Sequence, residues 1–126
     1  MLKVLIADDE EKICQLIIKL INWEEMGLKI AATASNGIEA LEQAKICKPE
    51  ILITDIRMPG IDGMELIRKV KEKLPDTEII IISGYRHFEY AQTAIRYGVR
   101  NYLLKPIKKE ELRDTLQKIA DINREK

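Results

Sequence analysis

The sequence predicts an α/β fold in which five parallel strands form one doubly wound sheet with helices on both faces. Short apolar runs typical of strands alternate five times with longer segments whose apolar residues recur at helical spacing. The runs that begin near positions 51 and 79 are apolar without alternation, as strands covered on both faces are. The length of 126 residues suits one domain. We therefore expect a single (βα)5 domain over residues 1–126.

The strands and helices follow one another in a regular order. The predicted strands lie at 2–7, 28–34, 51–55, 78–83 and 101–104, and the two without alternation are expected at the centre of the sheet. Three of the intervening helices show apolar residues at i, i+3, i+4 and i+7, which gives each of them one buried face. These residues are Ile13, Leu16, Ile17 and Leu20; Leu66, Ile67, Val70 and Leu74; and Leu112, Leu116 and Ile119.

Helix ends are marked by residues that favour caps and turns. The last segment, 110–126, is charged and is predicted to be helical up to its end. The remaining signals are Asn36-Gly37 before the second helix, Lys48-Pro49 after it, Asp62 with Glu65 as a capping box for the third, and Gly98 after the fourth.

Composition excludes several classes of protein. The chain has 21 basic and 21 acidic residues, so it lacks the basic excess of a nucleic-acid-binding domain. Cys14 and Cys47 lie in predicted helices without the spacing of a zinc or redox motif, which indicates reduced thiols. No apolar run approaches the roughly 20 residues of a membrane span. We expect a cytoplasmic protein without membrane contact, in which Lys69, Lys71 and Lys73 alternate with acids on a solvated face.

Four strand ends carry residues suited to chemistry. Asp8-Asp9 follow the first strand, Asp55 the third, Ser83 ends the fourth and Lys105 follows the fifth. In an open parallel sheet, ligands bind outside the carboxyl ends of the strands. We therefore expect carboxylates, hydroxyl and amine to meet in one crevice.

The acidic residues predict a magnesium site. Clustered carboxylates raise one another's proton affinity unless a cation lies between them. Magnesium suits one or two carboxylates together with waters and a phosphate oxygen. The predicted ligands are Asp8, Asp9, Asp55 and the backbone carbonyl of Arg57. Asp9 is expected to bind more directly than Asp8, which also suits the N-cap of the first helix and can act through water.

The same crevice suits phosphoryl transfer to Asp55. A phosphoryl group carries its charge on three oxygens, so catalysis rests mainly on positioning and charge neutralisation. Lys105 would pair with one oxygen and the Ser83 hydroxyl would donate to another. The Lys105-Pro106 bond can be cis, which would turn the chain sharply and aim the lysine into the crevice.

Taken together, these residues resemble the receiver domain of two-component response regulators, over the whole chain. The stretch Asp55–Gly63 is similar to the family's most specific motif, and Tyr102 matches its switch aromatic. The resemblance implies a flavodoxin-like sheet of strand order 2-1-3-4-5. The residues that match the family's site are Asp8-Asp9 as acidic pair, Asp55 as phosphoacceptor, Ser83 as hydroxyl and Lys105-Pro106.

Two further stretches, Ile21–Leu28 and Ser83–Ala91, are similar to receivers attached to AraC-type helix-turn-helix domains. DNA binding is then expected only through an output domain outside these 126 residues. The alternative is a stand-alone receiver that acts through protein–protein contacts. Gly84 departs from the family, where alanine is frequent, and is expected to loosen the loop after Ser83.

The resemblance implies a signalling switch and not an enzyme. A sensor histidine kinase would supply the phosphoryl group to Asp55 with Mg2+, and the chain itself would catalyse only its own phosphorylation and slow dephosphorylation. Ser83 and Tyr102 would then alter the surface of the fourth helix, fifth strand and fifth helix, which can also form a homodimer.

Two enzyme or carrier classes compete with this interpretation. A haloacid dehalogenase-type phosphatase carries its nucleophile after the first strand with a second acid two residues later. Here Asp55 follows the third strand and position 57 is arginine. A flavin or nucleotide carrier would need a Gly-rich phosphate loop after the first strand, which this sequence lacks.

Overall fold

The computed structural model describes residues 1–84, 88–99 and 101–124. The predicted strands are all present, although the third ends at Thr54, one residue earlier than expected. Residues 85–87, part of the second AraC-like stretch, and 125–126, the predicted end of the last helix, lie outside the described residues. The elements are β1 (Leu2–Ala7), α1 (Glu11–Leu20), a short 3-10 helix η1 (Glu24–Met26), β2 (Leu28–Ala34), α2 (Gly37–Cys47), β3 (Ile51–Thr54), α3 (Gly63–Lys73), β4 (Glu78–Ser83), α4 (Phe88–Arg96), β5 (Asn101–Leu104) and α5 (Lys109–Arg124).

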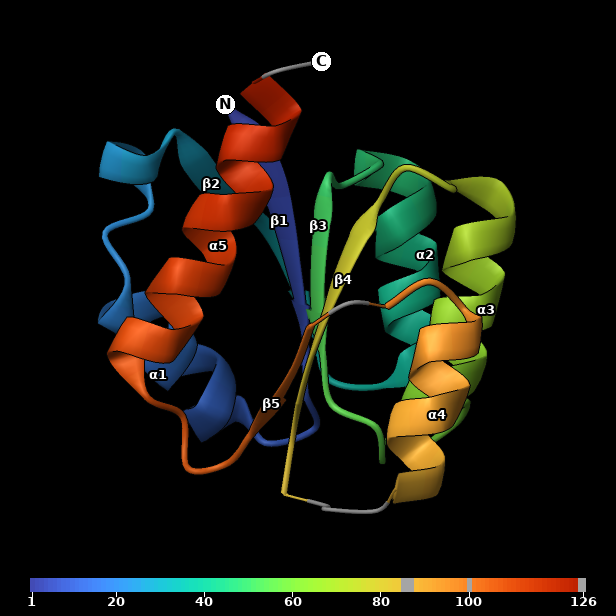
Figure 1. The fold of residues 1–126 in the computed structure, drawn as a ribbon. Coiled ribbons are helices and arrows are strands. Elements are labelled where there is room, and N and C mark those ends of the chain that lie inside the picture. Colours follow the sequence, from blue (N-terminus) through green and yellow to red (C-terminus); the bar gives the residue numbers. More distant parts are fainter. Residues whose placement is uncertain (85–87, 100, 125–126) are drawn as a thin grey trace.

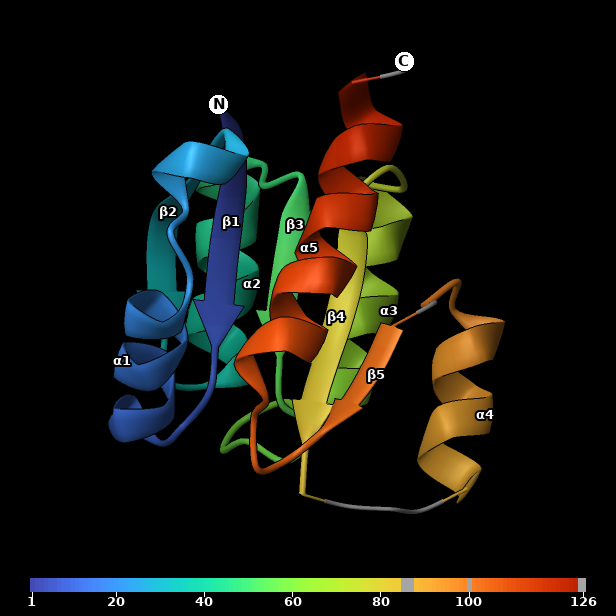
Figure 2. The same cartoon turned by 60° about the vertical axis from the view of Figure 1, so that its left-hand side comes forward.

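The sheet has the predicted doubly wound topology. Its strand order is β2-β1-β3-β4-β5, and every neighbouring pair is parallel. Helices α1 and α5 cover one face, while α2, α3 and α4 cover the other (Figure 1). Turning the molecule brings β5 into view at the open edge, flanked by α5 and α4 (Figure 2).

Packing is tightest at the centre of the sheet, as the uninterrupted apolar runs predict. Each residue of β3, from Ile51 to Thr54, is at most 1% exposed. Every residue of the edge strand β5 is only half-buried. A strand that is covered on both faces is held by close-packed neighbours on each side, whereas an edge strand has fewer.

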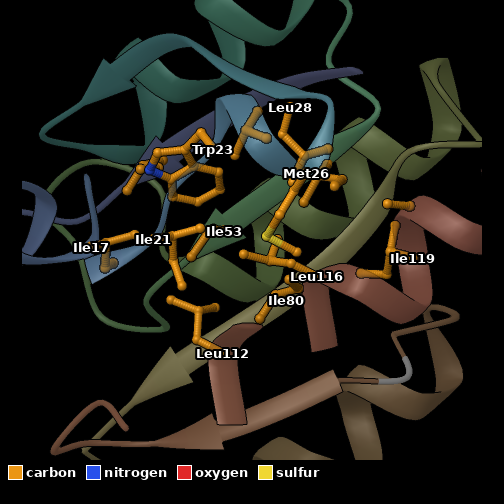
Figure 3. Close-up of a cluster of buried hydrophobic side chains, with 14 of the residues drawn as sticks. Ile17, Ile21, Trp23, Met26, Leu28, Ile53, Ile80, Leu112, Leu116 and Ile119 are labelled. Carbon is orange, nitrogen blue, oxygen red and sulfur yellow. The ribbon is translucent and has the colours of Figure 1, made fainter. Parts of the chain in front are cut away.

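Two hydrophobic clusters hold the layers together. The cluster under α1 and α5 includes Ile17, Ile53 and Leu116, together with Trp23 and Met26 (Figure 3). The second cluster lies under α2, α3 and α4. Burying each large aliphatic side chain contributes roughly 1.5–3 kcal/mol, so the apolar stripes of the helices are the main source of the layered architecture.

Side-chain caps begin two helices where the sequence predicts them. The Asn36 carboxamide accepts a hydrogen bond from the Glu39 backbone amide at 2.8 Å, and the Asp62 carboxylate accepts one from the Glu65 amide at 2.9 Å. The Glu65 carboxylate forms an ion pair with Arg68 at 2.9 Å. After α4, Gly98 adopts a φ of 84°, a left-handed conformation that glycine enters without steric cost.

The predicted N-cap of the first helix is wrong. The N-cap residue of α1 is Glu10, without a side-chain cap, and not Asp8. The Asp8 carboxylate is buried and pairs with Lys105, which follows the last strand, β5. Its other oxygen accepts a hydrogen bond from the Glu10 amide at 2.9 Å, which closes a local turn before the helix.

The cysteines and the tryptophan have structural roles. Cys14 is buried, Cys47 is half-buried, and both are free thiols. Burial raises the pKa of both thiols. The Trp23 indole packs in the core and donates a hydrogen bond to the Ile18 carbonyl at 3.0 Å, at the end of α1. None of the helices in the described part of the chain combines the length and the hydropathy needed to cross a bilayer.

Candidate functional site

Three strand ends meet at the Lys105 side chain. Its ammonium lies 3.0 Å from Oδ2 of Asp55 and 3.2 Å from Oδ2 of Asp8. These residues follow β5, β3 and β1, so the carboxyl edge of the sheet brings them together as the sequence predicts. A weaker third contact, 3.9 Å, joins Lys105 to the Glu10 carboxylate.

Backbone contacts fix the position of the Lys105 Cα at the end of β5. The Lys105 amide donates a hydrogen bond to the Ser83 carbonyl at 2.9 Å, and the Lys105-Pro106 peptide bond is cis. Burial lowers the pKa of Lys105, but hydrogen bonding and charge attraction to Asp55 and Asp8 outweigh it, and the pKa is raised overall. The amine is therefore a stable cation in the site.

The Asp55 carboxylate is held by the turn that follows β3. Its Oδ1 accepts a hydrogen bond from the Ile56 amide at 2.6 Å, while Oδ2 contacts Lys105. The Asp55 amide donates to the Ala7 carbonyl at 3.1 Å, which extends the β1–β3 pairing to the site. With one oxygen tied to the backbone and the residue 6% exposed, the carboxylate has a fixed orientation.

Gly63, the first residue of α3, packs directly against the turn after β3. A Cβ at position 63 would overlap the carbonyl oxygen of Asp55 and would lie 2.8 Å from the Cα of Ile56. The backbone of α3 therefore approaches the turn after β3 more closely than any residue with a side chain allows.

Asp8 lies beneath the opening of the site. It is 3% exposed, and burial is the main reason that its pKa is raised. The Glu10 amide and Lys105 act in the opposite direction, and the nearby Asp55 charge raises the pKa further. The ionised form of Asp8 is thus stabilised only in part by its partners.

The opening itself is an acidic cleft of about 410 Å³. Asp9, which is exposed, lies in its wall, whereas Asp8 does not reach the lining. Carboxylate oxygens of Asp8, Asp9 and Glu10 lie within 4.8 Å of one another. The lining consists of Asp9, Glu10, Asp55, Arg57, Gly84 and Lys105.

Two of these lining residues were not predicted as site residues. Glu10 directly follows the predicted acidic pair, and Gly84 directly follows Ser83, so adjacency was the available signal. The sequence alone does not predict that Glu10 lines the cleft, because its orientation depends on the turn before α1. The oxygens of this acidic set are the hard ligands that Mg2+ prefers.

Ser83 and Tyr102 are placed by the register of β4 and β5. Ser83 is fully buried at the end of β4 and pairs with Leu104, while Tyr102 pairs with Ile81. Because side chains on one face repeat every second residue, Ser83 and Tyr102 share a face of the sheet. This is the face of α2, α3 and α4, where Tyr102 packs against the second hydrophobic cluster.

A doubly wound parallel sheet with an acidic, lysine-bearing cleft at its carboxyl edge defines the class of open α/β domains that bind their ligands at this edge. The chain belongs to the response regulator receiver domain family, whose model matches residues 4–117. It is thus a receiver domain of a two-component response regulator. This family assignment removes the haloacid dehalogenase alternative, because the receiver-domain model matches residues 4–117. In addition, Asp55 follows β3, whereas a dehalogenase carries its nucleophile after the first strand.

Relatives and solved structures agree with this family. The chain is 43% identical over 126 residues to the uncharacterized transcriptional regulatory protein YesN of Bacillus subtilis, covering 99% of this chain and 34% of YesN. It is 38% identical over 120 residues to the transcriptional regulatory protein HptR of Staphylococcus aureus, covering 95% of this chain and 47% of HptR. The chain therefore spans a third to a half of these curated relatives.

The REC domain of AraT, a response regulator from Geobacillus stearothermophilus, has a similar structure. It superposes with a TM-score of 0.93 at 42% identity, covering 98% of this chain and 96% of that one. A two-component transcriptional regulator AraC from Clostridium phytofermentans gives a TM-score of 0.88 at 36% identity, covering 96% of this chain and 94% of that one. The name of the second structure agrees with the AraC-type likeness of the sequence.

Proposed function

We propose that this receiver domain stores a signal as a phosphoryl group on Asp55. The observation that carries the proposal is the Lys105 ammonium, which bridges Asp55 and the buried Asp8 beside an open acidic cleft. A cation already in contact with the acceptor carboxylate is suited to the oxygens of an incoming phosphoryl group.

The donor is a phosphohistidine of a sensor histidine kinase. A carboxylate oxygen of Asp55 forms the new P–O bond as the P–N bond of the donor breaks, and the imidazole leaves with the electron pair. Lys105 then neutralises one phosphoryl oxygen, and the Ser83 hydroxyl donates to another. Hydrolysis of the aspartyl phosphate ends the signal, so the chain is not an enzyme with sustained turnover.

The proposed cofactor is Mg2+, held by Asp9, Asp55 and the backbone carbonyl of Arg57, with Asp8 acting through water. The donor set supports this assignment, since the carboxylates of Asp8, Asp9 and Glu10 lie close together. Lys105 contacts those of Asp8 and Glu10. When bound, Mg2+ supplies neutralisation of the carboxylates and of the phosphoryl oxygens.

The proposed switch runs from Ser83 to Tyr102 and the edge of the sheet. Both side chains lie on the face covered by α2, α3 and α4, and β5 is only half-buried. A shift of the buried Ser83 toward the phosphoryl group vacates space that Tyr102 enters. The surface of α4, β5 and α5 then changes, and it contacts a homodimer partner or an output domain.

The proposed output is transcriptional. The YesN and HptR relatives are named transcriptional regulatory proteins, and they are two to three times as long as the matched region. DNA binding would belong to an output domain and not to residues 1–126, where acidic and basic residues balance. A receiver that acts alone through protein contacts is the alternative, and both would operate in the cytoplasm.

Phosphorylation of the purified chain tests the proposal. Incubation with acetyl phosphate and Mg2+ should add one phosphoryl group to the wild type, measured by intact-mass spectrometry. Asp55→Asn should remain unmodified. Asp62→Asn is the matched control, because Asp62 is an exposed acid of the same loop and asparagine also serves as an N-cap.

Equal labelling of the wild type and Asp55→Asn would exclude Asp55 as the acceptor. A second assay separates a receiver from a phosphatase, in which the wild type is given a generic phosphate ester in excess. We expect no sustained release of phosphate, and many turnovers per protein would contradict the stored-signal mechanism.

A further inference from the structure

A second charged feature lies between α2 and α3, away from the Asp55 cleft. These helices pack side by side on one face of the sheet (Figure 1). Between their C-terminal halves is an indentation of about 190 Å³, called here the lysine groove. Its floor is Leu41, Ala44, Val70 and Leu74, and its rim is Lys45, Lys48, Lys69 and Lys73.

The floor of the lysine groove is apolar and firmly built. Ala44 and Val70 are each 1% exposed and belong to the core under α2, α3 and α4. Leu41 and Leu74 are half-buried and pack against the same core. The groove is thus an opening onto the hydrophobic core, and not a gap between flexible side chains.

The rim carries uncompensated positive charge. Among the described residues, none of the four lysines takes part in an ion pair. Contact with Lys45, and the charges of Lys45 and Lys69, lower the pKa of Lys73. The whole chain has no net charge, so the positive charge of these four lysines is a property of the lysine groove and not of the protein as a whole.

The acids of α3 do not neutralise this rim, although the sequence alternates lysines with acids there. Glu65 and Glu72 each lie 2.9 Å from the guanidinium of Arg68. The Glu72 charge acts on Lys73, but it is weaker than the effect of Lys45. The prediction that Lys69, Lys71 and Lys73 lie on a solvated face among acids is therefore incomplete, because Lys45 and Lys48, at the end of α2, lie beside Lys69 and Lys73.

Helix electrostatics explain only part of this arrangement. Lys45 and Lys73 lie in the last turns of α2 and α3, where cations offset the negative end of a helix dipole. This effect requires neither Lys69, a turn earlier, nor an apolar floor between the two helices. Lysine ammoniums around an accessible apolar surface are complementary to a ligand that is both acidic and apolar.

The size of the groove indicates the kind of ligand. Sites for small molecules and cofactors occupy about 300–1,000 Å³, and this groove is smaller. Its volume is suited to one large apolar side chain, as at the anchor positions of protein interfaces. We propose that the lysine groove docks an acidic segment of a partner protein, which inserts one apolar side chain between flanking carboxylates.

The surroundings orient such a segment. A neighbouring depression shares Lys48, Lys73 and Leu74 with the groove, but Glu50 and Asp76 line its far side. Carboxylates of the partner are repelled there, so they lie on the side of Lys45 and Lys69. Because the helices run opposite to the strands, this end of the molecule is remote from Asp55, and docking does not compete with phosphorylation.

A peptide titration tests the proposal. The probe is a blocked pentapeptide with a central leucine flanked on each side by two glutamates, added to isotope-labelled protein in low salt. Methyl signals of Leu41, Val70 and Leu74 should shift and saturate, with a Kd below about 1 mM. The affinity should fall as salt screens the charges.

Matched variants and peptides decide the outcome. Lys45→Gln/Lys73→Gln should weaken binding at least about tenfold, which corresponds to about 1.4 kcal/mol of binding free energy. The melting temperature of this variant should be unchanged. The control Lys12→Gln/Lys19→Gln, on α1, should bind as the wild type does. A peptide with serine in place of leucine should bind more weakly.

Three results would overturn the proposal. One is that the peptides with leucine and serine bind equally, which leaves only nonspecific attraction. Another is that both lysine pairs reduce binding alike. The third is that inorganic polyphosphate displaces the peptide at lower concentration than the peptide itself binds, which would make the groove an anion site. Asp55→Asn should retain peptide binding, so failure of the proposed phosphorylation would not affect this test.

Discussion

The Lys105 ammonium lies 3.0 Å from Oδ2 of Asp55, so a cation already contacts the carboxylate proposed as the phosphoacceptor. Replacing Lys105 by methionine keeps the length of the side chain but removes the charge. We expect phosphorylation by acetyl phosphate to slow on the order of a hundredfold, by analogy with the loss of one donor to a charged transition state.

The initial rate of phosphorylation measures this effect. Lys109→Met is the matched control, because Lys109 is an exposed lysine at the start of α5. Its rate should equal that of the wild type. An unchanged rate in Lys105→Met would show that the ion pair has no part in the transfer.

Asp8→Asn should stabilise the metal-free protein at neutral pH. Burial raises the pKa of Asp8 above its ordinary value of 3.8, so the folded state favours the protonated acid. The stabilisation that protonated Asp8 contributes is present below the ordinary pKa and is lost as the pH rises through the folded-state pKa. Asparagine avoids this loss, and Lys105 keeps its contact with Asp55.

Thermal melts over the acidic to neutral range, without divalent metal, test this linkage. The melting temperature of Asp8→Asn should exceed that of the wild type by a few degrees at neutral pH, and the difference should shrink toward low pH. A variant that is less stable than the wild type at neutral pH would contradict the prediction.

Gly63→Ala should destabilise the fold by roughly 1–3 kcal/mol, since the added methyl group overlaps the carbonyl oxygen of Asp55. Gly84→Ala is the control, because a Cβ at position 84 has no heavy atom of the described residues within 4 Å. Its unfolding free energy should change by less than about 0.5 kcal/mol. Urea unfolding measures both, and equal stability of the two variants would refute the close approach of α3 to the turn after β3.

Magnesium should stabilise the wild type. At a concentration ten times the Kd, a ligand that binds only the folded state adds about 1.4 kcal/mol. The rise in melting temperature should be absent in Asp9→Ala and preserved in Asp114→Ala, an exposed acid of α5. The same rise in Asp9→Ala would mean that Mg2+ binds elsewhere.

Much of the fold follows from local sequence. The bounds of β2 and β4 match their predicted residues because apolar runs with polar ends define a strand without reference to its neighbours. Asn36 and Asp62 act as caps for the same reason, since each bonds to an amide three residues away. The convergence of Asp55 and Lys105 also follows, from the general geometry of parallel sheets.

Contacts between distant segments account for what the sequence did not reveal. The local sequence favours Asp8 as an N-cap, but in the structure its carboxylate is buried and forms an ion pair with Lys105. Likewise, Lys45 and Lys73 become neighbours only because α2 packs on α3. The periodicity of one helix states which face is buried, but not which residues of the next helix lie beside its rim.

The unequal burial of β3 and β5 makes one strand harder to displace than the other. All of β3 is enclosed by close-packed neighbours, and displacing such a strand opens voids that cost free energy. The half-buried strand β5 moves at lower cost. We therefore expect strain that begins at Asp55 to be relieved by movement of β5 more readily than by movement of β3, so that packing alone favours a response at this edge of the sheet.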